Sequence, residues 1–364
     1  MINEKQFTEL YTDVTKKATK IPQENYLDEG EYPIVDQGKG QIAGRWNEAE
    51  GLCIEIPAII FGDHTRAIKY IDEPFFIGAD GVKVLRPTNE ADNPKYYYYA
   101  LQAARIPNLG YSRHFKVVKE LMIRICSRSE QDRIVSILEE IDAVIEIRQA
   151  ELSALEQLVK SRFIEMFGDP ESNPYGHPTK KLSAIASYWN GLTYKPEDVQ
   201  EQGTIVLRSS NIQNSQLDFD DTVRVTCRIR EKQYVQNNDI LMCSRNGSAK
   251  LVGKVALISD IAEPMSFGAF MMIIRSDYYR YLMTYFQMDA FRNQIKTGAT
   301  TTINQITGNM LNQVILPVPD LSVVSRFATF VEQIDKSKFY IVQTQKIIEL
   351  LIRAIQYITK EVLS

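Results

Sequence analysis

The sequence lacks any apolar run near the roughly 20 residues that a bilayer-spanning helix needs. Its first stretch, residues 1–20, is polar and mixed in charge, unlike a secretory signal peptide. Both absences argue against a membrane or secreted protein, and we expect a cytoplasmic chain without a membrane partner. Cysteine is scarce, and the absence of a CxxC pair predicts reduced thiols rather than a zinc site. The four cysteines are Cys53, Cys126, Cys227 and Cys243.

Catalytic signatures are also missing. There is no GxxxxGK[ST] phosphate loop, no GxGxxG turn, no HExxH metal motif and no GxSxG elbow. Adenine-N6 methyltransferases carry an Asn/Asp-Pro-Pro-aromatic tetrapeptide, and the nearest string, Asn173-Pro174-Tyr175, lacks the second proline. With three histidines in all, a histidine-based site would need nearly every one of them. We therefore predict no catalytic, cofactor or metal site in this chain.

What is present is the composition of a globular protein, with 44% hydrophobic and 24% charged residues over 364 positions. This length predicts two or more domains. The net charge of -4 weighs against nucleic acid, but it is unevenly spread. Residues 128–170 carry five Lys and Arg against ten Asp and Glu, whereas residues 178–318 carry fifteen against twelve. This pattern suits an acidic helix that faces another protein. Partner subunits would then supply more of the positive field that attracts nucleic acid.

Two segments have the apolar period of long amphipathic helices. The first, Glu130–Phe167, follows Ser127 and Ser129, either of which can cap it, and it stops at Gly168-Asp169-Pro170. The second runs from Val324 to Leu363. Apolar heptads of this length commonly form a coiled-coil seam, so we predict that the two helices pack antiparallel.

The two halves of the chain are an internal repeat. A shift of 193 residues superposes Arg133 on Arg326 and Ile141-Asp142 on Ile334-Asp335. Each half also has a helical stretch, predicted at 94–104 and at 277–291. We therefore predict an α+β fold in which two domains of mixed sheet and helices alternate with the two long helices. The predicted bounds are 1–127 for the first domain, 128–170 for the first long helix, 171–318 for the linker and second domain, and 319–364 for the second long helix.

A buried strand leads into a polar turn in each half, at Ala58–Gly62 and at Asp239–Cys243. The turns carry Asp63, His64 and Arg66 in the first half, and Ser244, Arg245 and Asn246 in the second. Arginine can bridge guanine O6 and N7, and asparagine can bridge adenine N6 and N7. The alternative is a solvated turn held by an Asx-type hydrogen bond. Different side chains at equivalent points of a repeated domain favour the reading of two different base sequences.

Two further polar loops, 110–114 and 298–302, precede the last strand of each half and widen this set. The candidate DNA-contacting residues are Lys39, His64, Arg66, Tyr111, Arg113, His114, Arg208, Asn211, Arg245, Asn246, Lys250, Thr300 and Thr301.

The aromatic run Tyr96-Tyr97-Tyr98-Tyr99 could stack on bases. Consecutive residues do not share a face, however, so a helix partly buried against a sheet is the better interpretation.

Together, these features resemble the specificity subunits of type I restriction-modification systems, over essentially the whole chain. The resemblance is carried by the strings 61–66 and 78–81 in the first half and by 238–241, 245–248 and 252–254 in the second. The helix signature Ser129-Glu130-Gln131 through Ile141-Asp142 also contributes. The second helix departs from it, with Val323-Val324-Ser325 where Glu-Gln is expected.

The resemblance implies a non-catalytic subunit in which each domain reads one half of a bipartite target in double-stranded DNA. The paired helices would set the spacer and dock two modification subunits, which bind S-adenosylmethionine and methylate adenine. Restriction subunits would translocate and cut DNA.

Three alternatives remain open from the sequence. The first is the recognition subunit of a related system whose partner fuses nuclease and methyltransferase. The second is a coiled-coil scaffold that does not bind DNA. The third is a stand-alone nuclease, which ranks last because the sequence has no identifiable carboxylate-lysine or metal constellation.

Overall fold

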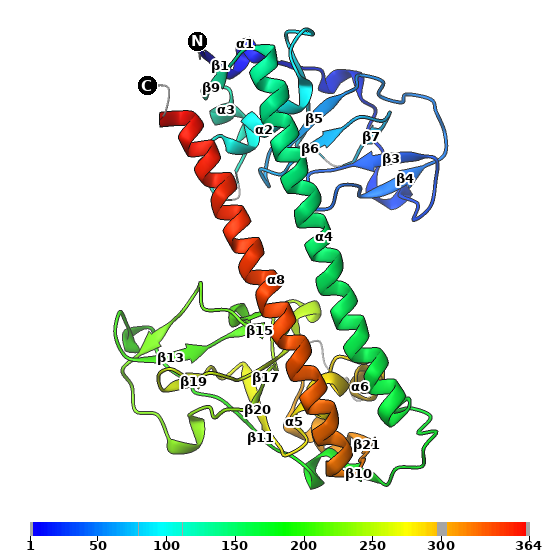
Figure 1. Cartoon of the computed structure of the whole chain (residues 1–364), viewed down its shortest axis with the longest axis vertical. Coiled ribbons are helices and arrows are strands. Elements are labelled where there is room, and N and C mark those ends of the chain that lie inside the picture. Colours follow the sequence, from blue (N-terminus) through cyan, green and yellow to red (C-terminus); the bar gives the residue numbers. More distant parts are fainter. Residues whose placement is uncertain (1–2, 79, 111, 297–303, 362–364) are drawn as a thin grey trace. The chain divides into compact units, whose positions relative to one another are not determined.

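The computed structural model describes residues 3–78, 80–110, 112–296 and 304–361. The chain divides into two compact units: unit 1 comprises residues 1–149 and 343–364, and unit 2 comprises residues 150–342 (Figure 1). Each of the two long helices, α4 (Arg128–Phe167) and α8 (Leu321–Glu361), belongs partly to each unit.

Unit 1 contains a four-stranded antiparallel sheet in the order β2-β8-β5-β6 and a three-stranded sheet in the order β4-β3-β7, in which β3 and β7 are parallel. A two-stranded sheet, β1-β9, precedes the long helix. The elements are β1 (Asn3–Gln6), α1 (Phe7–Leu10), β2 (Tyr11–Asp13), β3 (Tyr32–Val35), β4 (Gly44–Trp46), β5 (Ala58–Gly62), β6 (Ile68–Ile71), β7 (Phe76–Ile77), β8 (Val82–Pro87), α2 (Pro94–Ala103), α3 (Phe115–Val118) and β9 (Met122–Ile125).

Unit 2 repeats this strand order and adds β12 at the edge of its second sheet and a separate β14-β15 sheet. Its main sheets have the orders β11-β20-β17-β18 and β12-β16-β13-β19, with β13 and β19 parallel, and β10-β21 corresponds to β1-β9. The elements are β10 (Thr179–Lys181), β11 (Ser187–Asn190), β12 (Val199–Gln200), β13 (Thr204–Leu207), β14 (Ile212–Gln213), β15 (Gln216–Leu217), β16 (Arg224–Val225), β17 (Ile240–Cys243), β18 (Val255–Leu257), β19 (Met265–Phe267), β20 (Met271–Arg275), α5 (Tyr279–Tyr285), α6 (Asp289–Lys296), α7 (Gly308–Gln313) and β21 (Ile315–Pro317). The internal repeat and the α+β class are thus confirmed.

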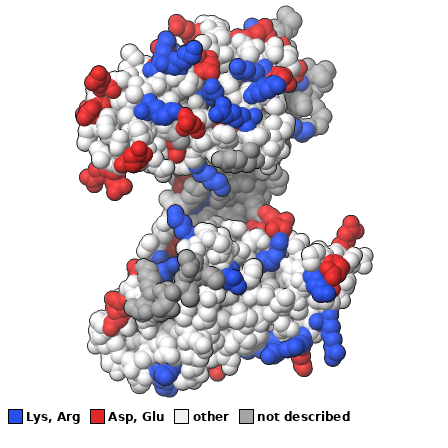
Figure 2. All heavy atoms as spheres, turned by 180° about the vertical axis from the view of Figure 1, so that it is seen from behind, with Lys and Arg blue, Asp and Glu red and all other residues white. Residues whose placement is uncertain are grey.

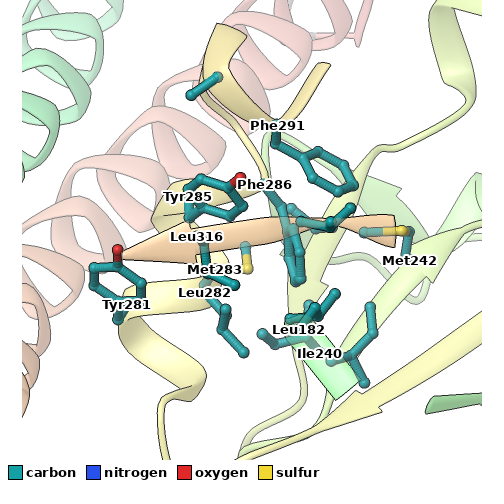
Figure 3. Close-up of a cluster of buried hydrophobic side chains, with 14 of the residues drawn as sticks. Leu182, Ile240, Met242, Tyr281, Leu282, Met283, Tyr285, Phe286, Phe291 and Leu316 are labelled. Atoms are coloured by element: carbon teal, nitrogen blue, oxygen red, sulfur yellow. The ribbon is translucent and has the colours of Figure 1, made fainter. Parts of the chain in front are cut away.

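The central strands β5 and β17 are apolar throughout because both faces are covered. In β17, Ile240 and Met242 enter one hydrophobic cluster while Leu241 and Cys243 enter another. Successive side chains of a strand point to opposite faces, so a doubly covered strand must be continuously apolar. Figure 3 shows the first of these clusters, in which aromatic rings from α5 and α6 lie beside Ile240, Met242 and Leu316.

Both long helices begin at a local cap. The Ser127 backbone N–H and its hydroxyl donate to the Glu130 carboxylate at 3.1 and 2.7 Å. In the second copy, the Ser322 N–H donates to the Asp320 carboxylate at 2.8 Å. Asp320 therefore caps this helix, although residues 323–325 lack the expected Glu-Gln. The helix α4 ends at Gly168, whose φ of +76° favours glycine.

Within unit 2, the end of α4 packs against the start of α8. The ring centroids of Phe167 and Phe327 are 5.3 Å apart, and the Arg162 guanidinium lies 5.8 Å from the Phe330 ring centroid. The later residue of α8 therefore lies beside the earlier residue of α4, so the two helices are antiparallel in this unit.

Tyrosines of α2 and α5 tie each domain to the strand before its long helix. The Tyr96 hydroxyl donates to the Arg124 carbonyl at 3.0 Å, and the Tyr281 hydroxyl donates to the Pro317 carbonyl at 2.7 Å. Arg124 and Pro317 are related by the shift of 193. The tyrosine run lies in a partly buried helix, as predicted, with Tyr96, Tyr97 and Tyr99 buried.

The helical stretch predicted at 277–291 is wrong as a single helix. Residues 286–288 separate α5 from α6, and α6 continues past residue 291 to Lys296. Among the described residues, no helix is both long and apolar enough to cross a membrane.

Candidate nucleic-acid interface

Three loops meet at one end of the sheets in each unit. They follow the central strand (β5 or β17), the first parallel strand (β3 or β13) and the second parallel strand (β7 or β19). In both units the glycine after the second parallel strand donates its N–H to the last residue of the first: Gly78 to Val35 and Gly268 to Leu207, each at 2.9 Å. The candidate turns therefore stand on the same frame in both units.

In unit 1, Gln37 joins these three loops. Its side-chain carbonyl accepts the His64 backbone N–H at 3.2 Å, and its amide N–H donates to the Asp80 carbonyl at 3.0 Å. The Thr65 hydroxyl donates to the Gln37 backbone carbonyl at 2.6 Å. The turn that presents His64 is thus held in one shape by its neighbours.

Arg66 is half-buried and takes the left-handed conformation, with φ of +61°. Its backbone N–H donates to the Gly62 carbonyl at 2.7 Å, closing the turn, and its guanidinium donates to the Ile106 carbonyl at 3.2 Å. A guanidinium has five N–H groups, so this contact leaves donors for a base.

His114 is 1% exposed and holds the turn from inside. Its Nε2 accepts the Leu109 N–H at 3.1 Å, so its Nδ1 carries the proton and donates to the Asp63 carbonyl at 2.9 Å. The Asp63 carboxylate in turn accepts the Phe115 N–H at 2.7 Å. Both side chains are used in shaping the loop.

Several charged side chains lie on these loops or contact them. Lys39 and Arg113 are exposed. A hydrogen bond from Lys20, together with its charge, lowers the pKa of Asp80, and the nearby Arg113 acts in the same direction. Burial lowers the pKa of Lys69, whose ammonium donates to the Asp36 carbonyl at 2.7 Å.

In unit 2, Arg245 is exposed and its guanidinium carbon lies 5.3 Å from the ring centroid of Phe270. The neighbouring Asn246 uses both ends of its amide locally: it donates to the Ser209 hydroxyl at 3.2 Å and accepts the Ser248 N–H at 3.0 Å. Lys250 is exposed on the short 3-10 turn that follows.

Arg208 and Asn211 follow β13 and are engaged with each other and with Asp221. The Asn211 side chain, 1% exposed, accepts the Arg208 N–H at 2.8 Å and donates to the carbonyls of Asp218 and Asp221, each at 2.9 Å. The Arg208 guanidinium donates to the Asp221 carboxylate at 2.8 Å. Tyr111, Thr300 and Thr301 lie outside the described residues.

Sequence reasoning missed Gln37 and Phe270. A signal for Phe270 was present: Gly78-Ala79-Asp80-Gly81 has a counterpart in Gly268-Ala269-Phe270, at the tip between β19 and β20.

Charged side chains of both signs are mixed on the surface. On the face drawn in Figure 2, Lys and Arg are scattered among Asp and Glu on each unit. Within the described part of the chain, His, Cys, Asp and Glu form no group of three or more suited to a metal ion.

Comparison with known proteins confirms the resemblance to type I specificity subunits. Residues 5–157 match the family model described as the type I restriction modification DNA specificity domain. Over 189 residues, 48% of this chain, the sequence is 28% identical to the StySPI specificity subunit of Salmonella potsdam and 26% identical to the EcoKI specificity subunit of Escherichia coli K12. The match spans only 41% and 40% of these two relatives, less than half of their length.

The fold has a counterpart among solved structures. The type I restriction-modification S subunit from M. genitalium is similar over 98% of this chain and 95% of its own, with a TM-score of 0.55 and 15% identity. At this identity the likeness bears on the fold.

Proposed function

Because residues 5–157 match the type I specificity domain and unit 2 repeats its strand order, we propose that this chain is the sequence-reading subunit of a type I restriction-modification complex. Each unit reads one half of a bipartite site in double-stranded DNA. The observation that carries the proposal is the duplicated loop frame, which presents different polar side chains at equivalent points. A scaffold without DNA binding would have no need for two such matched turns.

Burial divides the candidate residues into two roles. In unit 1 we assign DNA contact to Lys39, His64, Arg66 and Arg113, and in unit 2 to Arg245 and Lys250, because these side chains are exposed or half-buried on the loops. His114, Asn211 and Asn246 shape the loops instead, since their polar atoms are used within them. Arg208 keeps a positioning role beside Asp221. Tyr111, Thr300 and Thr301 stay candidates for DNA contact.

We further propose that two copies of one partner, the modification subunit, dock on the chain. Large apolar side chains are exposed at positions related by the shift of 193: Met122 (57%) with Ile315 (51%), and Ile147 (59%) with Tyr340 (70%). Apolar side chains exposed at equivalent points of a repeat suit a partner that binds twice. Restriction subunits complete the complex, which acts on DNA in the cytoplasm.

Catalysis belongs to the partners in this proposal. The chain itself uses no cofactor, and S-adenosylmethionine binds the modification subunit. The long helices set the distance between the two half-sites.

The test compares the purified chain with the chain co-purified with its modification subunit, each incubated with DNA and labelled S-adenosylmethionine. The proposal predicts methyl transfer to one two-part sequence with the pair, and none with either component alone. Methyl transfer by this chain alone would refute the assignment of catalysis. Unchanged transfer by the modification subunit without this chain would refute the recognition role.

A further inference from the structure

One pair of equivalent positions carries different residues in the two loop frames, although both positions accept the same backbone hydrogen bond. In the antiparallel register, Gly62 of β5 faces Val82, and Cys243 of β17 faces Met271. The residues just before these partners, Gly81 and Phe270, are therefore equivalent. Each of them accepts through its carbonyl the N–H that follows the central strand, from Asp63 at 2.7 Å in unit 1 and from Ser244 at 2.9 Å in unit 2.

In unit 1 this position is crowded and its backbone conformation favours glycine. A Cβ on Gly81 would lie 3.0 Å from the His64 ring, and the φ of +87° there favours glycine. His64, the second residue after β5, thus occupies the space above the glycine.

In unit 2 the same position carries Phe270, which is 59% exposed at the tip between β19 and β20. Arg245, the second residue after β17, lies over its ring. Hydrophobic packing does not account for an aromatic ring so exposed, and a cation–π contact restrains the long arginine side chain to few rotamers.

The backbone below Arg245 is fixed from two sides. The Phe270 carbonyl accepts the Arg245 N–H at 3.1 Å and also the Ser244 hydroxyl at 2.9 Å. On the other side, Arg245 forms an antiparallel bridge with Gln305, and the Ile306 N–H donates to the Ser244 carbonyl at 2.7 Å. An exposed side chain on a fixed backbone, with its head restrained, is preorganised for recognition.

We propose that Phe270 is a positioning residue that determines specificity: its ring holds the Arg245 guanidinium in the orientation that reads O6 and N7 of a guanine in the half-site of unit 2. Guanine is the base whose major-groove edge offers the two acceptors that a guanidinium fits. The equivalent positions in unit 1 carry His64 and Gly81, so an imidazole stands where unit 2 has a guanidinium, and we expect a different base preference. This inference rests on the proposed function.

The experiment uses the chain co-purified with its modification subunit, bound to DNA carrying the methylated site mapped for the wild type. The guanines of the unit 2 half-site are replaced one at a time by 7-deazaguanine, which lacks the N7 acceptor. The wild type should lose affinity by about 5- to 150-fold at one of these guanines. F270A and R245A should both lose the discrimination at that same guanine, F270Y should retain it, and the double variant should lose no more than R245A alone.

F219A is the matched control, because Phe219 is an exposed phenylalanine of unit 2 (46%) and should keep the wild-type preference. The inference would be overturned if F270A discriminated as the wild type does, or if F270A weakened binding equally at both half-sites. It would also be overturned if the affinity losses of F270A and R245A added fully in the double variant. If the wild-type complex methylates a two-part motif and F270A leaves that motif unaltered, only the proposed role of Phe270 in positioning Arg245 is refuted. If the wild-type complex methylates no two-part motif, the proposed function is refuted, and so is the role of Phe270 that rests on it.

Discussion

Polar residues at the loop ends differ in how they use their hydrogen-bonding atoms. His114 and Asn211 are buried and satisfied by the loops around them. Arg113, Arg245 and Lys250 are exposed on those same loops. The buried group fixes the loop shape, so the exposed group has less conformational freedom to lose when it binds a ligand.

At the residue scale, we expect Asp239 to be a strong stabilising residue of unit 2. Its carboxylate, 1% exposed, accepts two hydrogen bonds from the Arg275 guanidinium, at 2.6 and 2.8 Å. Asp239→Ala should lower the free energy of unfolding by about 2–3 kcal/mol, less than for a fully buried pair because Arg275 still reaches water.

Denaturant unfolding measures this difference. Asp221→Ala is the control, since the carboxylate of Asp221 pairs with Arg208 at the surface, and it should change the unfolding free energy by less than about 0.5 kcal/mol. Equal losses in the two variants would contradict this account of Asp239.

The sequence could propose these loop residues but could not sort them. His64 and His114 look alike in a polar loop, yet the His114 ring is enclosed because it bonds to Asp63, which is 51 residues away in the sequence, as well as to Leu109 in its own loop. Burial depends on tertiary neighbours that no local pattern contains. Phe270 was missed for a related reason, because its role depends on the strand register that brings it to Arg245.

Elements were more predictable than single residues wherever one physical signal dominated. The three-to-four spacing of apolar residues predicted α4 and α8, and the continuous apolar runs predicted the central strands β5 and β17. The break between α5 and α6 was missed because residues 277–296 contain no glycine or proline, and apolar residues recur on both sides of the break. Packing in the cluster of Figure 3, rather than a local stop signal, accompanies the change of direction.

At the element scale, the contact between α4 and α8 in unit 2 should depend on a few aromatic rings. Phe163 is fully buried, 4.9 Å from Tyr281 and 5.7 Å from Phe327 by ring centroid. Phe163→Ala should cost about 3–5 kcal/mol of unfolding free energy, through lost transfer energy and the cavity that remains.

Leu158→Ala is the control on the same helix, because Leu158 is 46% exposed and should cost less than about 1 kcal/mol. Thermal unfolding followed by circular dichroism compares the two variants. A Phe163→Ala protein as stable as Leu158→Ala would show that the aromatic cluster does not hold these helices together.

At the scale of the whole molecule, the chain consists of two repeated units that share the long helices α4 and α8. The shift of 193 residues predicted the duplication, and the repeated strand orders agree with it. The target sequence was beyond prediction, because the identity of a loop side chain does not decide which base it meets.

The proposed ruler predicts that longer helices lengthen the recognised spacer. The helix α4 is continuous over 40 residues, or about 60 Å at 1.5 Å per residue. Inserting four helix-forming residues after Gln149, with a matching insertion after Val342 in α8, adds about one turn, close to 6 Å, to each helix. The spacer in the methylated motif should lengthen by about two base pairs.

Replacing four residues at the same places by alanine, without a change in length, is the matched control and should keep the wild-type spacer. Sequencing of methylated host DNA reads the spacer directly. An insertion variant that methylates DNA with the original spacer would refute the ruler, whatever its effect on binding.

The central claim is that one chain carries two independent readers, and mapping the methylated motif in host DNA tests it most directly. The wild-type chain with its modification subunit should yield one two-part motif. Arg66→Ala should relax or abolish preference in one part only, and Arg245→Ala in the other part only, each by about 1–3 kcal/mol at the affected base. Variants that alter the same part, or that weaken both parts equally, would contradict the claim.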